Sequence, residues 1–306
     1  MQTHKQTLKH KPKHKPRHTL KHTGPHRSHE LELQGSTHSS TGFAKIRCKV
    51  QGEEEEGEIM ADKVLITFDV DGTLMQSTGL LANQLHKKAF SHAFLQVFGV
   101  EGTIDAIKHH GSTDPMVILN TLEHYGIPQE TAAPKLGELK AKMVEYAMQH
   151  ASEVGEGLEV LPGVRELLEV LSRQEEVIIG LVTGNLEDIA WLKMEGLGIR
   201  QFFSIPNFGG FGSDHSDRGE LVRIAAARAD QMFPGGFRLR AHVGDTPNDI
   251  RAAEFGGALA IGVCTGIFTQ KDLREASHSD TPAIILDNLL NVMNFINVLG
   301  VRCRDF

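Results

Sequence analysis

Short apolar runs alternate with segments of helical periodicity from about residue 160 onward, and this alternation narrows the folds open to the chain. Strand-like runs occur at 177–182, 201–206, 239–244, 259–263 and 283–286, and helical segments at 163–172, 186–197, 219–230 and 247–255. Strands that alternate with helices build βαβ units, in which the strands are parallel and the helices cover the sheet. The sequence therefore predicts an α/β protein with a doubly wound, Rossmann-like parallel sheet.

One further strand precedes these, in the segment LITFDVDGTLMQ at residues 65–76. Leu65, Ile66 and Phe68 give the near-continuous apolar pattern of a parallel strand that is buried on both faces. Asp69 and Asp71 follow at its carboxyl end, and side chains two residues apart point the same way. Two carboxylates this close repel each other, so a cation or a shared proton must relieve them.

The stretch from 79 to 160 interrupts the alternation, because its apolar residues follow a helical period throughout. An amphipathic stripe runs over residues 81–97, a second helix is predicted with Asp114 as N-cap and Pro115 in its first turn, and a third at about 131–150. We expect a helical cap at 79–160, inserted into a core formed by 60–78 and 161–306.

The first 59 residues differ in composition from the rest. Residues 1–29 contain six Lys, two Arg, no acidic residue and several prolines, and residues 51–58 read QGEEEEGE. A segment with little to bury stays disordered. We therefore predict a disordered basic, His-rich tail followed by an acidic linker.

Charge and cysteine content exclude several kinds of partner. The net charge of −7 includes +8 from residues 1–29, so the remainder carries −15, and an acidic body argues against nucleic acid. No apolar run is long enough to span a bilayer. Three scattered cysteines indicate neither a disulfide framework nor a zinc site. We expect a cytoplasmic protein without membrane or nucleic-acid partners; an organellar address in the tail is the open alternative.

Polar clusters follow three of the predicted strands. Ligands of open α/β sheets bind outside the carboxyl ends of the strands, so these clusters should meet at one edge. A basic residue lies on the loop before the 219–230 helix. The set comprises Asp69, Asp71, Thr183, Gly184, Asn185, Arg218, Asp245 and Asp249.

Phosphoryl transfer is the chemistry that uses such a set. Asp69 can attack phosphorus to give an acyl-phosphate, and Asp71 can protonate the leaving oxygen and later deprotonate water. Thr183, the amides around Asn185, and Arg218 can hold phosphoryl oxygens. Carboxylates gathered around Asp69, with Asp245 and Asp249, are the oxygen ligands that suit Mg²⁺.

FDVDGTL, TGN, the Arg218 region and GDTPND resemble, in order, the four motifs of the haloacid dehalogenase superfamily. The helical insertion is similar to the cap of its phosphoglycolate phosphatase and β-phosphoglucomutase branch, and the resemblance covers residues 63–298. It implies a nucleophile and metal ligand at Asp69 and an acid/base at Asp71, whose backbone carbonyl would bind the metal. It also implies phosphoryl contacts at Thr183 and Arg218 and a third metal contact at Asp245. Asp249 would be either a metal ligand or a residue that supports one.

Two features of this sequence modify what the resemblance implies. Lys is commoner than Arg at the basic position, and no Lys lies between Lys193 and Lys271, so Arg218 is the candidate. Members that act on 2-haloacids lack the second aspartate and need no metal, so Asp71 argues against dehalogenation.

Plainer interpretations of these residues stay open. Asp69 and Asp71 could form a strand-end turn, Thr183–Asn185 could cap the following helix, and Asp249 could cap the helix after Pro247. In the cap, residues 109–115 (HHGSTDP) either turn between helices or reach into the site, where His110, Ser112 and Thr113 would select the substrate. His86 is expected on the polar, solvent-facing side of its helix.

We expect a Mg²⁺-dependent phosphatase acting on a small phosphorylated metabolite of the phosphoglycolate kind. A phosphomutase of the β-phosphoglucomutase type is one rival. The other is a non-catalytic protein that binds partners through its His/Lys-rich tail. The sequence does not indicate an oligomeric state.

Overall fold

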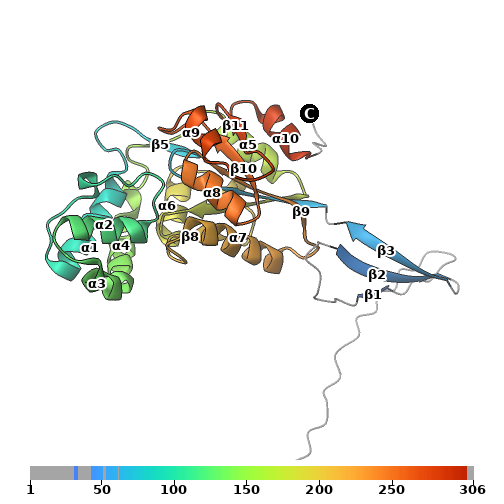
Figure 1. Ribbon diagram of the computed structural model, residues 1–306, viewed down its shortest axis with the longest axis horizontal. Helices are drawn as coiled ribbons and strands as arrows, with labels where there is room; N and C mark the ends of the chain where they lie inside the picture. Colours follow the sequence, from blue (N-terminus) through green and yellow to red (C-terminus); the bar gives the residue numbers. More distant parts are fainter. Residues whose placement is uncertain (1–30, 34–42, 51–52, 61, 302–306) are drawn as a thin grey trace, which may run out of the picture. The chain divides into compact units, whose positions relative to one another are not determined.

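The computed structural model describes residues 31–33, 43–50 and 53–60 as strands, and residues 62–301 with their side chains. Residues 61–306 form one compact unit and the segment before them another. The tail predicted at 1–30 lies outside the described residues. Within residues 62–301, six parallel strands form one sheet in the order β11-β10-β9-β4-β7-β8 (Figure 1). The strands are β4 (Lys63–Phe68), β7 (Val177–Thr183), β8 (Gly209–Phe211), β9 (Phe237–Gly244), β10 (Leu259–Val263) and β11 (Ile284–Leu286).

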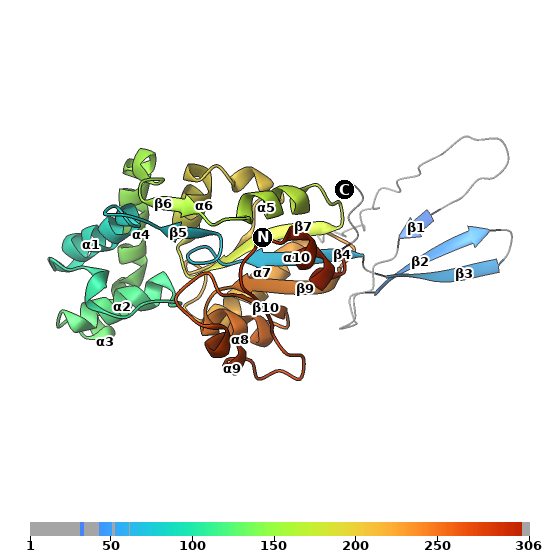
Figure 2. The same ribbon diagram turned by 90° about the horizontal axis from the view of Figure 1, so that it is seen from above.

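Helices cover both faces of this sheet, which confirms the doubly wound α/β fold (Figure 2). In β4, Val64, Ile66 and Phe68 face one side and Leu65 the other, because strand side chains alternate. The first face is covered by α5 (Val164–Ser172), α6 (Glu187–Gly196) and α10 (Val292–Leu299). The second is covered by α7 (Arg218–Met232), α8 (Pro247–Phe255) and α9 (Gln270–Glu275).

The segment between β4 and α5 carries the helices that the sequence predicts as a cap. They gather beyond one end of the sheet (Figure 1) and are α1 (Gln84–Phe98), α2 (Asp114–His124), α3 (Gln129–Ala132) and α4 (Leu136–Gln149). Short 3-10 turns join them and later elements: η1 (Ile104–Ala106), η2 (Ala133–Lys135), η3 (Ala151–Glu153) and η4 (Arg200–Phe202). Their apolar core includes Leu186 and Ile189, so this bundle packs on the start of α6.

A two-stranded antiparallel ribbon brackets the helical insertion, and the sequence did not indicate it. β5 (Met75–Ser77) pairs with β6 (Leu158–Val160), with Met75 opposite Val160. The ribbon is closed by a hydrogen bond from the Thr78 amide to the Gly157 carbonyl, 2.9 Å. The chain therefore enters and leaves the insertion side by side.

One strand prediction is corrected. Residues 201–206 are not a strand: residues 201 and 202 end η4, and the chain then bends through Pro206, which has no amide hydrogen to donate to a ladder. The strand at this edge of the sheet is instead β8, in the Gly-rich stretch that follows the bend. A Cβ on Gly210 would lie 2.0 Å from the Leu221 carbonyl oxygen, so glycine allows α7 to pack against this strand.

The acidic segment predicted as a linker is also corrected, since it forms a strand. β3 (Glu53–Met60) pairs with β2 (Phe43–Val50), which pairs with β1 (Leu31–Leu33), all antiparallel. The register sets Lys45 opposite Glu58 and Lys49 opposite Glu54. This pairing between separate segments is not visible in the acidic run alone.

Candidate active site

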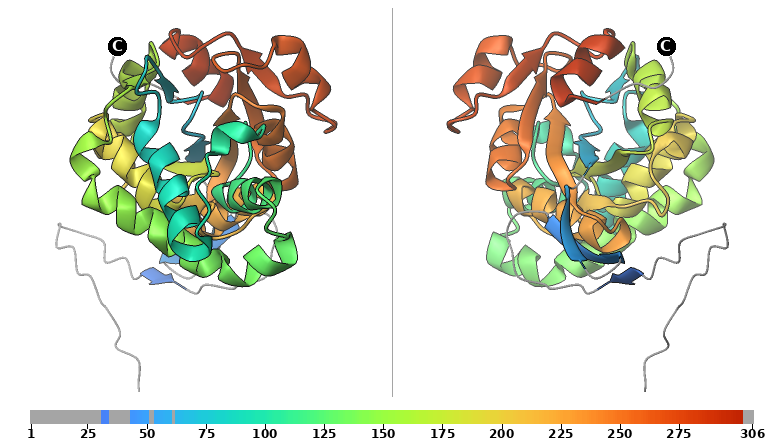
Figure 3. Two further views of the ribbon diagram at one scale, coloured as in Figure 1. Left: turned by 90° about the vertical axis from the view of Figure 1, so that its left-hand side faces the viewer. Right: turned by 90° about the vertical axis from the view of Figure 1, so that its right-hand side faces the viewer.

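The carboxyl ends of β4, β7 and β9 meet at one edge of the sheet, as the sequence predicts. β4 lies between β7 and β9, so the later strands are added to the sheet on both sides of β4 and the strand order changes direction there. Such a switch point is the usual ligand site of an open α/β sheet. The helices of the insertion lie beyond the same end (Figure 3).

Three aspartates converge there behind the end of β4. Carboxylate oxygens of Asp69, Asp245 and Asp249 all lie within 4.8 Å of one another, and the three residues are buried. Burial, with the charges of Asp249 and Asp245 opposing Arg218, raises the pKa of Asp69 well above its ordinary value. Burial and Asp249 likewise raise the pKa of Asp245 to about 7.

Arg218 is the cation that reaches this cluster. It begins α7, preceded by Asp217, whose side chain accepts from the Gly219 amide as an N-cap. Its guanidinium pairs with Asp69 through Nη2 and with Asp249 through Nε, at 2.7 Å from Asp249 Oδ1. One positive charge thus faces three carboxylates, and this imbalance is what a divalent cation would relieve.

Asp249 is fixed by its helix as well as by Arg218. Thr246 and Asp249 form a capping box at the start of α8, so the interpretation of Asp249 as a capping residue holds together with its place in the cluster. Burial opposes its ionisation, but Arg218 and the contact with His242 lower the pKa of Asp249 well below its ordinary value. His242, on β9, lies between Thr67 and Asp249.

Asp245 is held at the end of β9 by tight backbone packing. Thr73 Oγ1 donates to its carboxylate at 3.2 Å. Gly72 has φ of +92°, and a Cβ there would lie 2.4 Å from Asp245 Oδ2. A Cβ on Gly266 would lie 1.8 Å from the same oxygen. Glycine is therefore needed at position 72 for two reasons: the backbone has a positive φ there, and the Asp245 carboxylate leaves no room for a side chain.

Asp71 is not a member of the acidic cluster and has partners of its own. Its side chain is 36% exposed and is held by Lys193, with Nζ at 2.8 and 2.9 Å from the two carboxylate oxygens. Asn185 Nδ2 donates to the same carboxylate at 3.0 Å. Burial opposes ionisation, but the charges of Lys193 and His86 and these hydrogen bonds lower the pKa of Asp71.

Thr183 and Asn185 follow β7 and lie at the same edge. Thr183 is buried, and its Oγ1 accepts from the Asn185 amide at 3.3 Å. The N-cap of α6 is Leu186, so Thr183–Asn185 do not cap this helix. The side chain of Asn185 is already bound to Asp71 and Lys193, which leaves the backbone of this loop and Thr183 for phosphoryl oxygens.

The loop at 109–115 reaches the core and is not a plain interhelical turn. The Gly111 carbonyl accepts from Asn248 Nδ2 at 2.8 Å and from Arg218 Nη1 at 3.3 Å. Thr113 is buried, and its hydroxyl donates to the Ser216 carbonyl at 2.9 Å. Thr113, not Asp114, is the N-cap position of α2. His110 is exposed and Ser112 half-buried.

Asp114 joins this loop to the core loop after β7. Its amide donates to the Gly184 carbonyl at 2.7 Å, and its carboxylate accepts from the Leu186 amide at 2.9 Å. His86 is 3.0 Å from the same carboxylate and only 5% exposed, so its prediction as a surface histidine is wrong. The polar side of α1 packs against α2 here. Helical periodicity shows which residues share a face of a helix, but not which other helix that face contacts.

Lys193 was not among the site residues predicted from the sequence. One signal in the sequence could have indicated its role: Lys193 is four residues from both Ile189 and Leu197, on the apolar side of α6. A lysine in such a stripe is rarely buried without a partner, and the partner is Asp71, 122 residues earlier.

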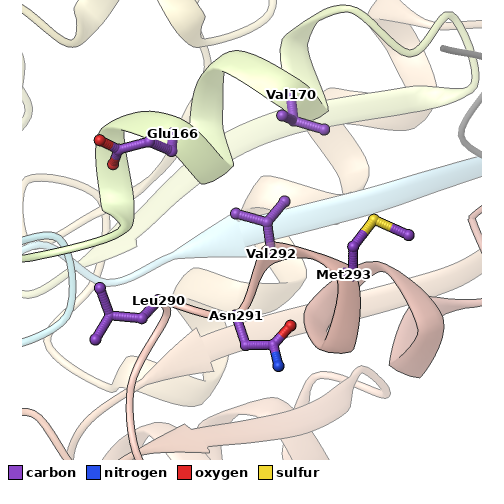
Figure 4. Close-up of a pocket in the computed structure, with 6 residues that line it drawn as sticks. All are labelled: Glu166, Val170, Leu290, Asn291, Val292 and Met293. Carbon is purple, nitrogen blue, oxygen red and sulfur yellow. The ribbon is translucent and has the colours of Figure 1, made fainter. Parts of the chain in front are cut away.

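A hollow of the surface lies away from these residues. A shallow groove of about 510 Å³ runs between α5 and the start of α10, with Glu166 and Val170 facing residues 290–293 (Figure 4). None of its lining residues belongs to the acidic cluster. Within the described residues, no helix is both long and apolar enough to cross a membrane.

Residues 64–257 match the haloacid dehalogenase-like hydrolase family, and residues 225–292 match a second model of the same kind. The chain belongs to the haloacid dehalogenase-like hydrolases, which is what the motifs indicated. It is an enzyme of the hydrolase class.

Relatives with assigned names agree with this. The chain is 29% identical to the phosphoglycolate phosphatase of Chromobacterium violaceum over 202 residues, which are 66% of this chain and 85% of that protein. It is 25% identical to the phosphoglycolate phosphatase of Pectobacterium atrosepticum over 235 residues, 76% of this chain and 91% of that protein.

Solved structures share the fold. A hydrolase of Pseudomonas syringae superposes with a TM-score of 0.51 at 20% identity, over 77% of this chain and 98% of that one. A protein of Bacteroides vulgatus, provisionally named a β-phosphoglucomutase, gives 0.52 at 18% identity, over 79% and 90%. At this identity the likeness concerns the fold alone.

Proposed function

We propose that this enzyme hydrolyses a small phosphorylated metabolite of the phosphoglycolate kind, with Mg²⁺, through an aspartyl-phosphate on Asp69. The observation that carries the proposal is the division of carboxylates at the end of β4. Asp69 faces Arg218 and two further aspartates, while Asp71, two residues on, faces Lys193 and the open side. One carboxylate therefore lies with the residues proposed to hold the metal and the phosphoryl group, and the other is bound by a different set of side chains.

The reaction then takes two steps on these residues. In the first, a carboxylate oxygen of Asp69 attacks phosphorus, the bond to the leaving oxygen breaks, and the Asp71 carboxyl group gives that oxygen its proton. In the second, a water oxygen attacks phosphorus and the Asp71 carboxylate takes the water proton. The bond from phosphorus to Asp69 breaks, so inorganic phosphate leaves and both aspartates return to their starting states.

Arg218 would hold the phosphoryl group while it moves. Its guanidinium already bridges Asp69 and Asp249, so it lies where a phosphoryl oxygen bound to Asp69 would develop charge. Thr183 and the backbone at Gly184 and Asn185 would bind the other phosphoryl oxygens. Arg is suited to this role because its planar fork binds two oxygens at once.

The acidic cluster fits a divalent cation. Three buried carboxylates within 4.8 Å, facing a single guanidinium, are the oxygen donors that Mg²⁺ takes. Asp69, Asp245 and Asp249 would hold it, with the Asp71 backbone carbonyl as a fourth protein ligand. A bound Mg²⁺ would offset the charge of these carboxylates and of the incoming phosphate.

Substrate selection is proposed for the loop at 109–113. Its Gly111 carbonyl accepts hydrogen bonds from Arg218 and Asn248, and this contact with a residue proposed to bind the phosphoryl group supports the assignment. His110 and Ser112 are the residues proposed to meet the leaving group. Thr113, the third residue of the sequence prediction, has its hydroxyl engaged by Ser216 in this structure, so it would act mainly in holding the loop.

The test is phosphate release from 2-phosphoglycolate and from an aryl phosphate, with Mg²⁺ and with EDTA. Turnover that needs Mg²⁺ and is lost in Asp69→Asn supports the proposal; turnover that survives in Asp69→Asn contradicts it. A phosphomutase would instead show little release and would interconvert sugar phosphates only with a bisphosphate primer. If the protein instead acts by binding partners through its tail, a chain lacking residues 1–59 should lose those partners. Under the phosphatase proposal, we expect the same truncated chain to keep the turnover of the full-length protein.

A further inference from the structure

Lys193 is a charged residue buried almost completely, with 1% of its side chain exposed. Its ammonium nitrogen is 2.8 and 2.9 Å from the two Asp71 oxygens and 2.7 Å from Asn185 Oδ1. An ammonium group has three hydrogens and accepts none. These contacts therefore account for its whole hydrogen-bonding capacity.

Asn185 closes the arrangement. Its Oδ1 accepts from Lys193 while its Nδ2 donates to Asp71 Oδ2 at 3.0 Å. The two contacts fix the orientation of the amide, because only one end of it can donate. Lys193, Asn185 and Asp71 thus form a closed ring of hydrogen bonds, in which each residue contacts the other two.

The two charged members of the ring differ sharply in exposure. The Asp71 side chain is 36% exposed and that of Lys193 only 1%. On its other side, the lysine stem borders a cavity of about 10 Å³ lined by residues such as Leu158 and Ile189. That volume holds at most about one water. Lys193 therefore has no free donor and no adjacent space with which to bind a substrate group itself.

A buried ion pair adds little to folding stability on average, since desolvation consumes most of the attraction. What such a pair does supply is geometry. An acid that must deliver a proton has to be held within a few tenths of an ångström of its productive position. The ring provides this from behind, and the exposed side of the carboxylate is left for the leaving group.

We propose that Lys193 is a positioning residue for Asp71, fixing this carboxylate, together with Asn185, toward the oxygen of the leaving group. The inference rests on the proposed function, in which Asp71 protonates that oxygen. It makes a distinctive prediction, because proton donation matters only for leaving groups that depart poorly as anions. Alkyl phosphates need the acid, whereas aryl phosphates of acidic phenols depart without it.

The experiment compares wild type and Lys193→Met on 2-phosphoglycolate and on p-nitrophenyl phosphate, with saturating Mg²⁺. For the alkyl ester we expect kcat of the variant to fall by roughly 10- to 100-fold, because this is part of what a general acid usually contributes. Its KM should stay within about 3-fold of the wild-type value. For the aryl ester we expect both constants within about 3-fold of wild type. Lys193→Arg, which keeps the charge, should recover part of the loss on the alkyl ester.

A matched control is Lys140→Met. Lys140 is half-buried, and its Nζ also donates to another residue, the Ser213 carbonyl at 3.1 Å, but it has no hydrogen bond to Asp71. Its replacement should leave the ratio of the two activities unchanged. If Lys193→Met does not fold, as thermal unfolding would reveal, Lys193→Gln enters the same comparison.

A double-variant cycle supplies an independent readout. If Lys193 acts through Asp71, adding Lys193→Met to Asp71→Asn should cost less than about 2-fold more on the alkyl ester. Equal losses on both esters, or losses that multiply in the double variant, would overturn the inference and leave the phosphatase proposal standing. Wild type that releases phosphate from neither ester would overturn the proposed function, and this inference with it.

Discussion

Thr246 and Asp249 bind each other through three hydrogen bonds at the start of α8. Asp249 Oδ2 accepts from the Thr246 amide at 3.0 Å and from its hydroxyl at 2.6 Å, and Thr246 Oγ1 accepts from the Asp249 amide at 3.3 Å. The other oxygen of Asp249 is paired with Arg218. One carboxylate therefore both starts a helix and takes part in the candidate active site, so the two roles can be separated by experiment.

Thr246→Ala should reduce both stability and activity. The helix loses its cap, at about 1 kcal/mol of unfolding free energy, and Asp249 loses an orienting partner, for which we expect a fall in kcat/KM on the order of 10-fold. Thr269→Ala is the matched control, because Thr269 and Asp272 form the same capping box at α9 and its hydrogen bonds involve no aspartate of the cluster. It should lose stability alone. Equal activities for the two variants would show that the box does not orient Asp249 for catalysis.

Asp69→Asn should lower kcat by at least about 10³-fold, since the nucleophile is gone. In metal-free protein it should also raise the melting temperature. The pKa of Asp69 is raised by burial, which means that the folded protein favours the neutral form that asparagine imitates. Addition of Mg²⁺ should stabilise wild type more than the variant, as thermal unfolding with and without the metal would show. A variant less stable than wild type under EDTA would contradict this picture of the cluster.

The stability of metal-free protein should depend on Asp245. Burial and Asp249 raise its pKa to about 7 in the folded state, against about 4 in the unfolded chain. Between these values the folded chain holds a proton that the unfolded chain lacks, so unfolding becomes easier as pH rises. Relative to Asp245→Asn, wild type should be most stable near pH 4 and lose that advantage by pH 7. Mg²⁺ should reverse the order of the two at neutral pH.

Gly184→Ala should disturb the contact between the insertion and the core. An added Cβ would lie 2.5 Å from the Ser112 carbonyl oxygen and 2.8 Å from Thr113 Cα, both backbone atoms that cannot rotate aside. Displacement of this loop by about 1 Å should cost roughly 10- to 100-fold in kcat/KM.

Gly137→Ala is the control for that substitution. Gly137 lies in α4 with open space around its Cα, so alanine should leave activity unchanged and stabilise the helix by up to about 1 kcal/mol. Comparable losses in the two variants would show that the Gly184 contact has no special importance.

The sequence predicted what depends on local pattern. The apolar run before Asp69, the strand before Thr183 and the strand before Asp245 were each recognisable, and parallel strands place their ends at one edge. The convergence of Asp69, Asp245 and Asp249 followed from this rule without any knowledge of distances.

What the sequence could not predict depends on pairing across the chain. His86 looked exposed because its partner, Asp114, is on another helix, and Lys193 had no role because Asp71 is 122 residues away. The acidic run at 53–60 looked like a linker because the basic strand opposite it had not been matched to it. The roles of the individual site residues stay predictions that the experiments above address.

The chain enters the insertion through β5 and leaves it through β6, and these two strands are paired, with Ser77 opposite Leu158. A helical block from a relative could thus be transplanted by two splices, one on each side of this ribbon. The graft would succeed only if it also carried a carbonyl in the place of Gly111 and a backbone able to pass over Gly184 without a gap or a clash. Modules with different preferences for the leaving group are therefore exchangeable in principle, but each has to bring its own matching loop.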